Sequence, residues 1–167
     1  MRGINAIIVT ADPQGRFDEG IITDTSKPGT CMETVPSTPM SSGRFSYRHT
    51  SRNDGAKGEV IVLLPDKLQG ASVDTAYTAN RRGFLYWPKA GDELNMLMRR
   101  QTGTGTLGSE NVGDPLEIDG ASGMLQAVGS GGPTGTHASA PFMLLEHLGV
   151  SLTGDTLVHV RYTGNNA

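Results

Sequence analysis

The most constraining feature of the sequence is residues 83–99, GFLYWPKAGDELNMLMR, in the middle of the chain. The stretch opens with an apolar run that holds the single tryptophan and ends at Pro88, which lacks the backbone N–H that a sheet ladder needs. Gly91 can adopt a positive φ, and Asp92 can accept a hydrogen bond from nearby backbone, as in a tight turn. From residue 93 to residue 99 the side chains alternate as in a half-buried strand. The stretch therefore predicts a strand, a corner and a second strand of a small sandwich or barrel.

Other short segments also have the composition of strands. A continuous apolar run at residues 60–64 is typical of a strand buried on both faces. Residues 142–148 fit a helix or a buried strand, and the flanking proline and glycine favour the strand. The remaining candidates are residues 6–9, 19–23, 30–35, 116–118, 124–128 and 156–162. With 23 glycines and 9 prolines to form turns, the predicted fold class is all-β or β-dominated, a small β-barrel or sandwich.

Residues 1–57 differ from the rest in pattern. The stretch 36–43 is polar, punctuated by prolines and without periodicity, and cations then surround two aromatic residues. We interpret residues 1–57 as an extended N-terminal arm or subdomain and residues 58–167 as the β-rich domain. The arm is expected to make much of the contact with a partner: isoleucines add a strand to an exposed sheet edge, and cations register the arm on an acidic surface. The expected interface residues are Ile7, Ile8, Ile21, Ile22, Arg44, Tyr47, Arg48 and Arg52.

Sequence motifs that would indicate a catalytic or binding site lack the neighbouring residues that such a site needs. Residues 103–108 match the glycine pattern of a dinucleotide site, but the following SENVGDP offers no helix to hold a pyrophosphate. Cys31 is the single cysteine, and only Lys27 lies nearby in sequence to lower its pKa, so we expect a buried, unreactive thiol. The four histidines lack metal-site spacing. We therefore predict no catalytic residue, no cofactor and no metal.

Charge and hydropathy exclude further classes. A net charge of −3 favours neither nucleic-acid binding nor attachment to a membrane. The apolar run at residues 6–9 is too short for a signal peptide or a membrane span. The lack of a second cysteine suits a reduced, cytosolic place of assembly. Acidic residues that a glycoside hydrolase would place across a cleft are expected instead in solvated turns; they are Asp92, Glu93, Asp114, Glu117 and Asp119.

Three stretches together resemble a known family. They are DTAYTAN followed by GFLYWPKAGDE at residues 74–93, GDPLEIDGASGML at residues 113–125, and APF through Glu146 to VHVR at residues 140–161. In this order they resemble the head decoration (cement) proteins of tailed bacteriophages, over about residues 58–165. Residues 1–57 match no constant element of that family, and the family has no catalytic residues to carry over.

The resemblance implies a structural virion protein that binds the outer surface of an icosahedral capsid and stabilises it. Its partner would be the major capsid protein, after assembly in the host cytoplasm. Short β-segments leave edges that need cover, so we also expect a homo-oligomer, most often a trimer and next a dimer.

Two other function classes remain open from the sequence. A carbohydrate-binding β-sandwich would use Trp87, Tyr86 and Tyr77 as an exposed stacking platform, whereas a structural protein would bury Trp87. A small enzyme would hold its site in a pocket between the arm and the barrel.

Overall fold

The computed structural model describes residues 7–10, 15–35, 44–50, 59–66, 72–99, 111–128, 140–148 and 154–164. Every regular element in these residues is a strand, which confirms the predicted all-β class for this part of the chain. The strands are β1 Ile8–Thr10, β2 Arg16–Ile22, β3 Cys31–Thr34, β4 Ser46–His49, β5 Ile61–Leu64, β6 Arg81–Trp87, β7 Glu93–Met98, β8 Pro115–Ile118, β9 Leu125–Ala127, β10 Phe142–Leu144 and β11 Thr156–Tyr162.

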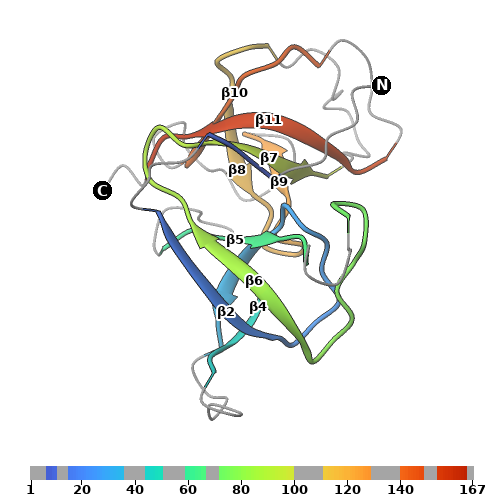
Figure 1. The fold of residues 1–167 in the computed structure, drawn as a ribbon. Coiled ribbons are helices and arrows are strands. Elements are labelled where there is room, and N and C mark those ends of the chain that lie inside the picture. The colour runs from blue at the N-terminus through green and yellow to red at the C-terminus, as the bar shows by residue number, and fades with distance from the viewer. Residues whose placement is uncertain are drawn as a thin grey trace.

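The strands form two small barrels, one above the other in Figure 1. The first barrel closes in the order β2-β4-β3-β5-β6. The second is built from a sheet of order β1-β7-β11-β10-β8-β9, which a parallel pairing of Met98 with Leu125 closes between β7 and β9. Closure gives most strands a neighbour on both sides and so removes most open edges.

The central stretch of the sequence connects the two barrels. β6 belongs to the first barrel and β7 to the second, with a corner between them. Gly91 has a φ of 101°, and the Asp92 carboxylate accepts the Lys89 N–H at 2.7 Å, as predicted for a tight turn. The Tyr86 hydroxyl also donates to Asp92, at 2.5 Å. The predicted strand–corner–strand is confirmed, although it crosses between two barrels and is not one bend of a single barrel.

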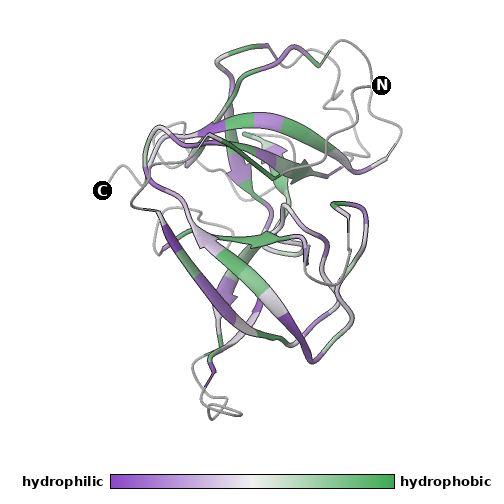
Figure 2. Cartoon of the chain, viewed as in Figure 1, coloured by the Kyte–Doolittle hydropathy of each residue, from purple (hydrophilic) through white to green (hydrophobic). Residues whose placement is uncertain are grey.

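Strand β5 forms part of the wall between the two cores. Val60, just before it, and Val62 pack with the core of the second barrel, whereas Ile61 and Leu63 pack inside the first barrel. Figure 2 shows the strand as apolar along its length. A strand in this position has no polar face, because both of its sides are covered. The prediction of a strand buried on both faces is confirmed.

The edge of β7 that faces away from β11 is covered by separate segments. The Asn95 N–H donates to the carbonyl of Ile7 at 2.6 Å, at the start of β1. The Leu97 N–H donates to the carbonyl of Gly29 at 2.9 Å, in the loop before β3. β9 pairs with the far end of the strand. A loop of the first barrel thus completes the sheet of the second.

The predicted arm is corrected by this topology. β2, β3 and β4 all come from residues 1–57, and they close one barrel together with β5 and β6. Ile22, Met32 and Tyr47 supply a large part of that barrel's core. The cation-rich stretch around Tyr47 is a half-buried strand, with Tyr47 inside and Arg48 outside. A boundary at residue 57 would therefore separate strands that share one core. Residues 36–43, 51–58, 67–71 and 100–110 lie outside the described residues.

Gly29 is the position at which we expect a single methyl group to disturb both barrels. Its φ is +85°, and an added Cβ would lie 3.0 Å from the backbone nitrogen of Leu97 and 3.0 Å from Leu157 Cδ2. We expect Gly29→Ala to lower the free energy of unfolding by about 2–4 kcal/mol, from backbone strain and overpacking together. The measurement is urea denaturation followed by circular dichroism.

Gly91→Ala is the matched control for this substitution. Gly91 also has a positive φ, +101°, but an added Cβ there meets no atom within 4 Å. This variant should lose only the backbone strain, about 1–2 kcal/mol. Equal losses for the two variants would contradict the role given to Gly29.

Candidate functional site

Three of the residues predicted for the interface are buried. Ile7 packs in the core shared with the second barrel, and Ile22 and Tyr47 pack inside the first barrel. Ile22 belongs to β2, which is paired on both sides at this point, by β4 and by β6. These three residues therefore belong to the barrel cores and are not exposed to the shell or neighbouring subunit that the predicted arm was expected to contact.

The other predicted interface residues lie nearer the surface. Ile8 and Ile21 are half-buried, in β1 and on the outer side of β2. Arg48 is exposed and its Nε donates to Glu33 at 2.7 Å. Arg44 precedes β4 and lines a surface hollow. Arg52 lies outside the described residues.

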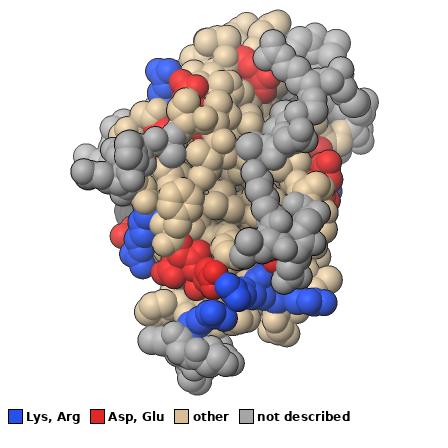
Figure 3. All heavy atoms as spheres, in the orientation of Figure 1, with Lys and Arg blue, Asp and Glu red and all other residues tan. Residues whose placement is uncertain are grey.

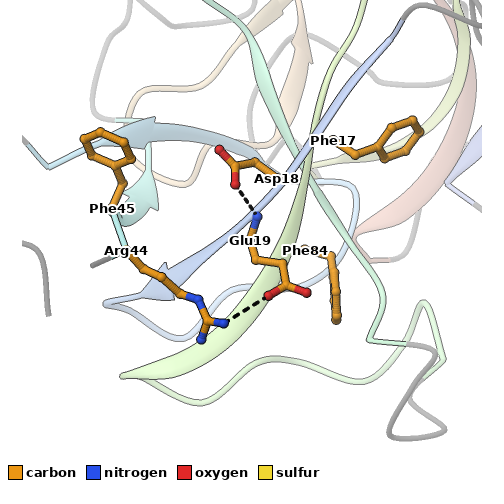
Figure 4. A pocket seen from close by; sticks show the side chains of 6 residues that line it. All are labelled: Phe17, Asp18, Glu19, Arg44, Phe45 and Phe84. Atoms are coloured by element: carbon orange, nitrogen blue, oxygen red, sulfur yellow. Dashed lines mark hydrogen bonds and ion pairs between the residues drawn. The ribbon is translucent and has the colours of Figure 1, made fainter. Parts of the chain in front are cut away.

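The hollow has a volume of about 530 Å³ and lies on the first barrel. Two of its aromatic residues are exposed hydrophobic side chains, Phe17 at 59% and Phe45 at 48% of their surface. Figure 4 shows the Arg44 and Glu19 side chains reaching toward each other between the rings. The lining residues are Phe17, Asp18, Glu19, Arg44, Phe45 and Phe84. Together with Arg82, which contacts Glu19, we call them the aromatic–arginine surface.

The hollow exists because the two neighbours of β2 differ in length. β6 pairs with β2 from Arg16 to Ile22, whereas β4 pairs only with Ile21 and Ile22. Along residues 16–20, no described strand covers the other edge of β2. The Ile21 N–H points toward β4, where it donates to Phe45. By alternation the Glu19 N–H points the same way, and the Asp18 carboxylate accepts it at 2.8 Å.

Charged groups on this surface are paired but accessible. Glu19 Oε2 lies 3.4 Å from Arg44 Nη2, and Glu19 Oε1 contacts Arg82 Nη2. The Arg82 guanidinium also lies over the Phe84 ring, 5.6 Å from its centre. Cationic and acidic side chains meet in the same way over the lower part of the face drawn in Figure 3. Ion pairs this exposed contribute little to stability because solvent screens them, so a partner can exchange them at small cost.

Sequence patterns missed most of this surface, although a signal was present. Across β2 and β6, Phe17 stands opposite Tyr86, and Glu19 stands opposite Phe84. The two phenylalanines therefore share the strand face of Glu19. An aromatic residue beside a glutamate on one face of a strand is the signal that would have indicated an interaction surface.

The aromatic platform of the carbohydrate alternative is not formed. Tyr86 and Tyr77 are buried, and the Tyr77 hydroxyl donates to the carbonyl of Leu64 at 2.8 Å. Trp87 is half-buried, and the Arg16 guanidinium covers its ring 4.4 Å from the centre. The three side chains leave no shared open face on which a sugar ring would stack.

Chemistry-bearing residues elsewhere are engaged in the structure. Cys31 is buried, as expected, and burial raises the pKa of its thiol well above the usual range. The His49 imidazole contacts Asp24, which also accepts the Ser26 hydroxyl at 2.9 Å. Within the described ranges, no three His, Cys, Asp or Glu side chains gather as metal ligands do. None of the described residues forms a helix long and apolar enough to cross a membrane.

The predicted solvation of the turn acids is wrong for three of them: Asp92, Glu117 and Asp119 are buried. Burial raises the pKa of Asp119, but donors outweigh it and hold the pKa below its usual value. These donors are the Ser122 hydroxyl, the Ala121 N–H and the Arg99 guanidinium. The acids are therefore structural groups that fix turns and strand ends.

The pKa of Glu117 is shifted in the opposite direction to that of Asp119. Burial raises the pKa of Glu117, and the hydrogen bond from Gln126, at 3.0 Å across the β8–β9 hairpin, only partly opposes it. Glu93 shows the reverse: its hydrogen bond with Arg161 lowers its pKa. The fold therefore disfavours the ionised form of Glu117 and favours the ionised form of Glu93.

No protein-family model matches the chain, and no curated protein matches it either. The sequence and the exposed surface of the first barrel therefore remain as the indications of function.

We expect Glu117→Gln to stabilise the protein at neutral pH. The raised pKa means that folding penalises the ionised carboxylate, a penalty present above the folded pKa and absent below the unfolded value of about 4.3. The amide oxygen of glutamine can still accept the hydrogen bond from Gln126. The melting temperature of the variant should exceed that of the wild type near pH 7, and the difference should shrink toward about pH 4.

Glu93→Gln provides a control of opposite sign. Its lowered pKa means that the ionised form contributes stability, which is present above the unfolded pKa and is lost as pH falls through the folded pKa. This variant should melt below the wild type at neutral pH and converge with it in acid. Melting differences that stay constant with pH in both variants would contradict the two assignments.

Proposed function

We propose that the chain is a structural, non-catalytic virion protein that binds the outer surface of an icosahedral phage capsid and stabilises it, as decoration (cement) proteins do. The observation that carries the proposal is the aromatic–arginine surface, where Phe17 and Phe45 remain exposed on a barrel whose core is packed. Aromatic residues and arginine are the types enriched in protein interfaces and among their hot spots. The sequence resemblance over residues 58–165 supplies the identity of the partner.

A small surface suffices for this function because the shell is repetitive. Each copy makes a modest contact, and many copies on one lattice, linked to one another, attach far more firmly than one alone. The proposed partner is the major capsid protein, and the proposed location is the outer face of the virion. The aromatic–arginine surface replaces the predicted N-terminal arm as the attachment site.

Shell binding is the direct test of this proposal. The purified chain should co-sediment with empty shells of the tailed phage that encodes it. Replacing Phe17 or Phe45 by alanine should weaken binding about tenfold each, because truncating a central aromatic contact costs about 1–2 kcal/mol. Val112→Ala is the matched control, since Val112 is an exposed apolar residue that does not line the hollow. An unchanged thermal transition excludes misfolding as the cause.

Two results would contradict the proposal. The first is a chain that stays in the supernatant at every shell concentration. The second is a loss of binding in Val112→Ala as large as that in the phenylalanine variants, which would place the contact elsewhere.

We also propose that the chain forms a homo-oligomer, a trimer or next a dimer. Both barrels close most of their edges, but β1 has β7 as its one described neighbour and exposes Val9. Sedimentation equilibrium should give a mass of three or two chains. A single species near 17.6 kDa, both free and after release from shells, would contradict this expectation.

A further inference from the structure

We infer that the aromatic–arginine surface docks a short partner segment that carries carboxylates beside a bulky apolar side chain. The inference rests on the proposed function, because it assigns this segment to the shell protein. It goes further by naming the chemistry that the segment must have. Charge, shape and the state of the β2 edge each contribute to it.

Two arginines flank the Glu19 carboxylate and can bind further carboxylates. Arg44 and Arg82 each contact this carboxylate through Nη2, and their side chains stay 40% and 43% exposed. A guanidinium has five N–H donors, so both arginines retain donors for a second carboxylate. Arg81 at the start of β6 is exposed as well. With Arg16, which pairs with Asp18, four arginines accompany the two carboxylates in this part of the first barrel, on a chain of net charge −3, and this balance favours an acidic partner.

Three phenylalanine rings line the hollow and determine what fits in it. Phe17 packs against Tyr86 with ring centres 4.7 Å apart, which fixes one wall of the hollow. Phe45 and Phe84 line the hollow from β4's side and from β6 (Figure 4). A hollow of about 530 Å³ is large enough for a bulky apolar side chain. Apolar burial then contributes affinity, and the flanking carboxylates set the orientation.

The β2 edge argues for contact through side chains. Strand addition needs free main-chain N–H groups along an edge. Here the Asp18 carboxylate already accepts the Glu19 N–H, at 2.8 Å, and an inward-pointing charge of this kind blocks pairing. Asp18 and Glu19 also place negative charge inside the hollow, so the apolar side chain of the segment must enter it while the carboxylates stay at the rim. A segment that presents separate carboxylates to the arginine rim avoids both obstacles.

The test uses the full-length chain and a defined peptide. The probe is acetyl-Glu-Glu-Leu-Phe-Glu-Glu-amide, titrated into isotope-labelled protein and followed by amide chemical shifts. Two control peptides replace all four glutamates by glutamine, or Leu-Phe by Ala-Ala. We expect the probe to shift amides of β2, β6 and residues 44–45, and each control to bind at least tenfold more weakly. Raising the salt concentration should weaken binding of the probe, since salt screens interactions between exposed charges.

Two protein variants separate this surface from general charge effects. The double variant Arg44→Gln with Arg82→Gln should bind the probe about tenfold more weakly. Arg48→Gln is the matched control, because Arg48 is an exposed arginine paired with Glu33 and does not line the hollow. It should bind as the wild type does. Unchanged amide shifts in the second barrel confirm that each variant is folded.

Several outcomes would overturn the inference. These are equal affinity for the glutamine peptide, unchanged binding in the double variant, or tighter binding of a thymidine decanucleotide than of the probe. Concentration-dependent shifts of the same amides without peptide would also overturn it, by showing a second copy as the occupant. Shell binding that survives in the double variant overturns this inference and leaves the proposed function intact. Peptide binding by a chain that does not co-sediment with shells would support the docking surface and contradict the proposed function.

Discussion

The two barrels depend on one loop residue that both of them share. The Gly29 N–H donates to the carbonyl of Leu63 in β5 at 2.8 Å, and the Gly29 carbonyl accepts the Leu97 N–H of β7 at 2.9 Å. One peptide segment therefore belongs to the hydrogen-bond ladders of both barrels. Its positive φ and the close approach of Leu97 and Leu157 leave space for a hydrogen atom alone. This contact joins the barrels together with the shared wall at β5 and the Cys31 N–H, which donates to the carbonyl of Gly123 at 2.8 Å.

Local alternation predicted much of the fold, because a strand's period of two is visible in a few residues. β11 has the bounds expected for it, and the β6–corner–β7 stretch was identified from an apolar run, the turn residues 88–92 and the alternation that follows them. The assignment of strands to barrels was not accessible in this way. The first barrel is closed by the parallel pairing of β2 with β4, and nothing in the sequences of these two strands indicates that they pair. The cations near Tyr47 concealed β4. A strand of a closed barrel can carry charged side chains on its outer face while its inner face is buried.

The site was less predictable than the fold for a related reason. Of the seven described residues expected at an interface, Arg44 alone lines the hollow. The hollow exists because β4 leaves residues 16–20 of β2 uncovered, a difference in strand length that arises from tertiary pairing. The burial of Glu117 also depends on tertiary pairing and could not be predicted, because its partner Gln126 becomes a neighbour only when the β8–β9 hairpin forms. Buried polar groups are determined by their partners, and the partners by the fold.

Barrel closure also shapes how such a protein can bind. A closed barrel offers few main-chain donors to a partner, and the Asp18 carboxylate caps one donor at the opening that remains. Recognition is thereby shifted to side chains, where phenylalanine rings supply area and arginines supply direction. The Glu19 pairs keep the arginines extended over the hollow in the free protein at little energetic cost. A partner carboxylate then meets guanidinium groups already in place, which lowers the ordering entropy that binding must overcome.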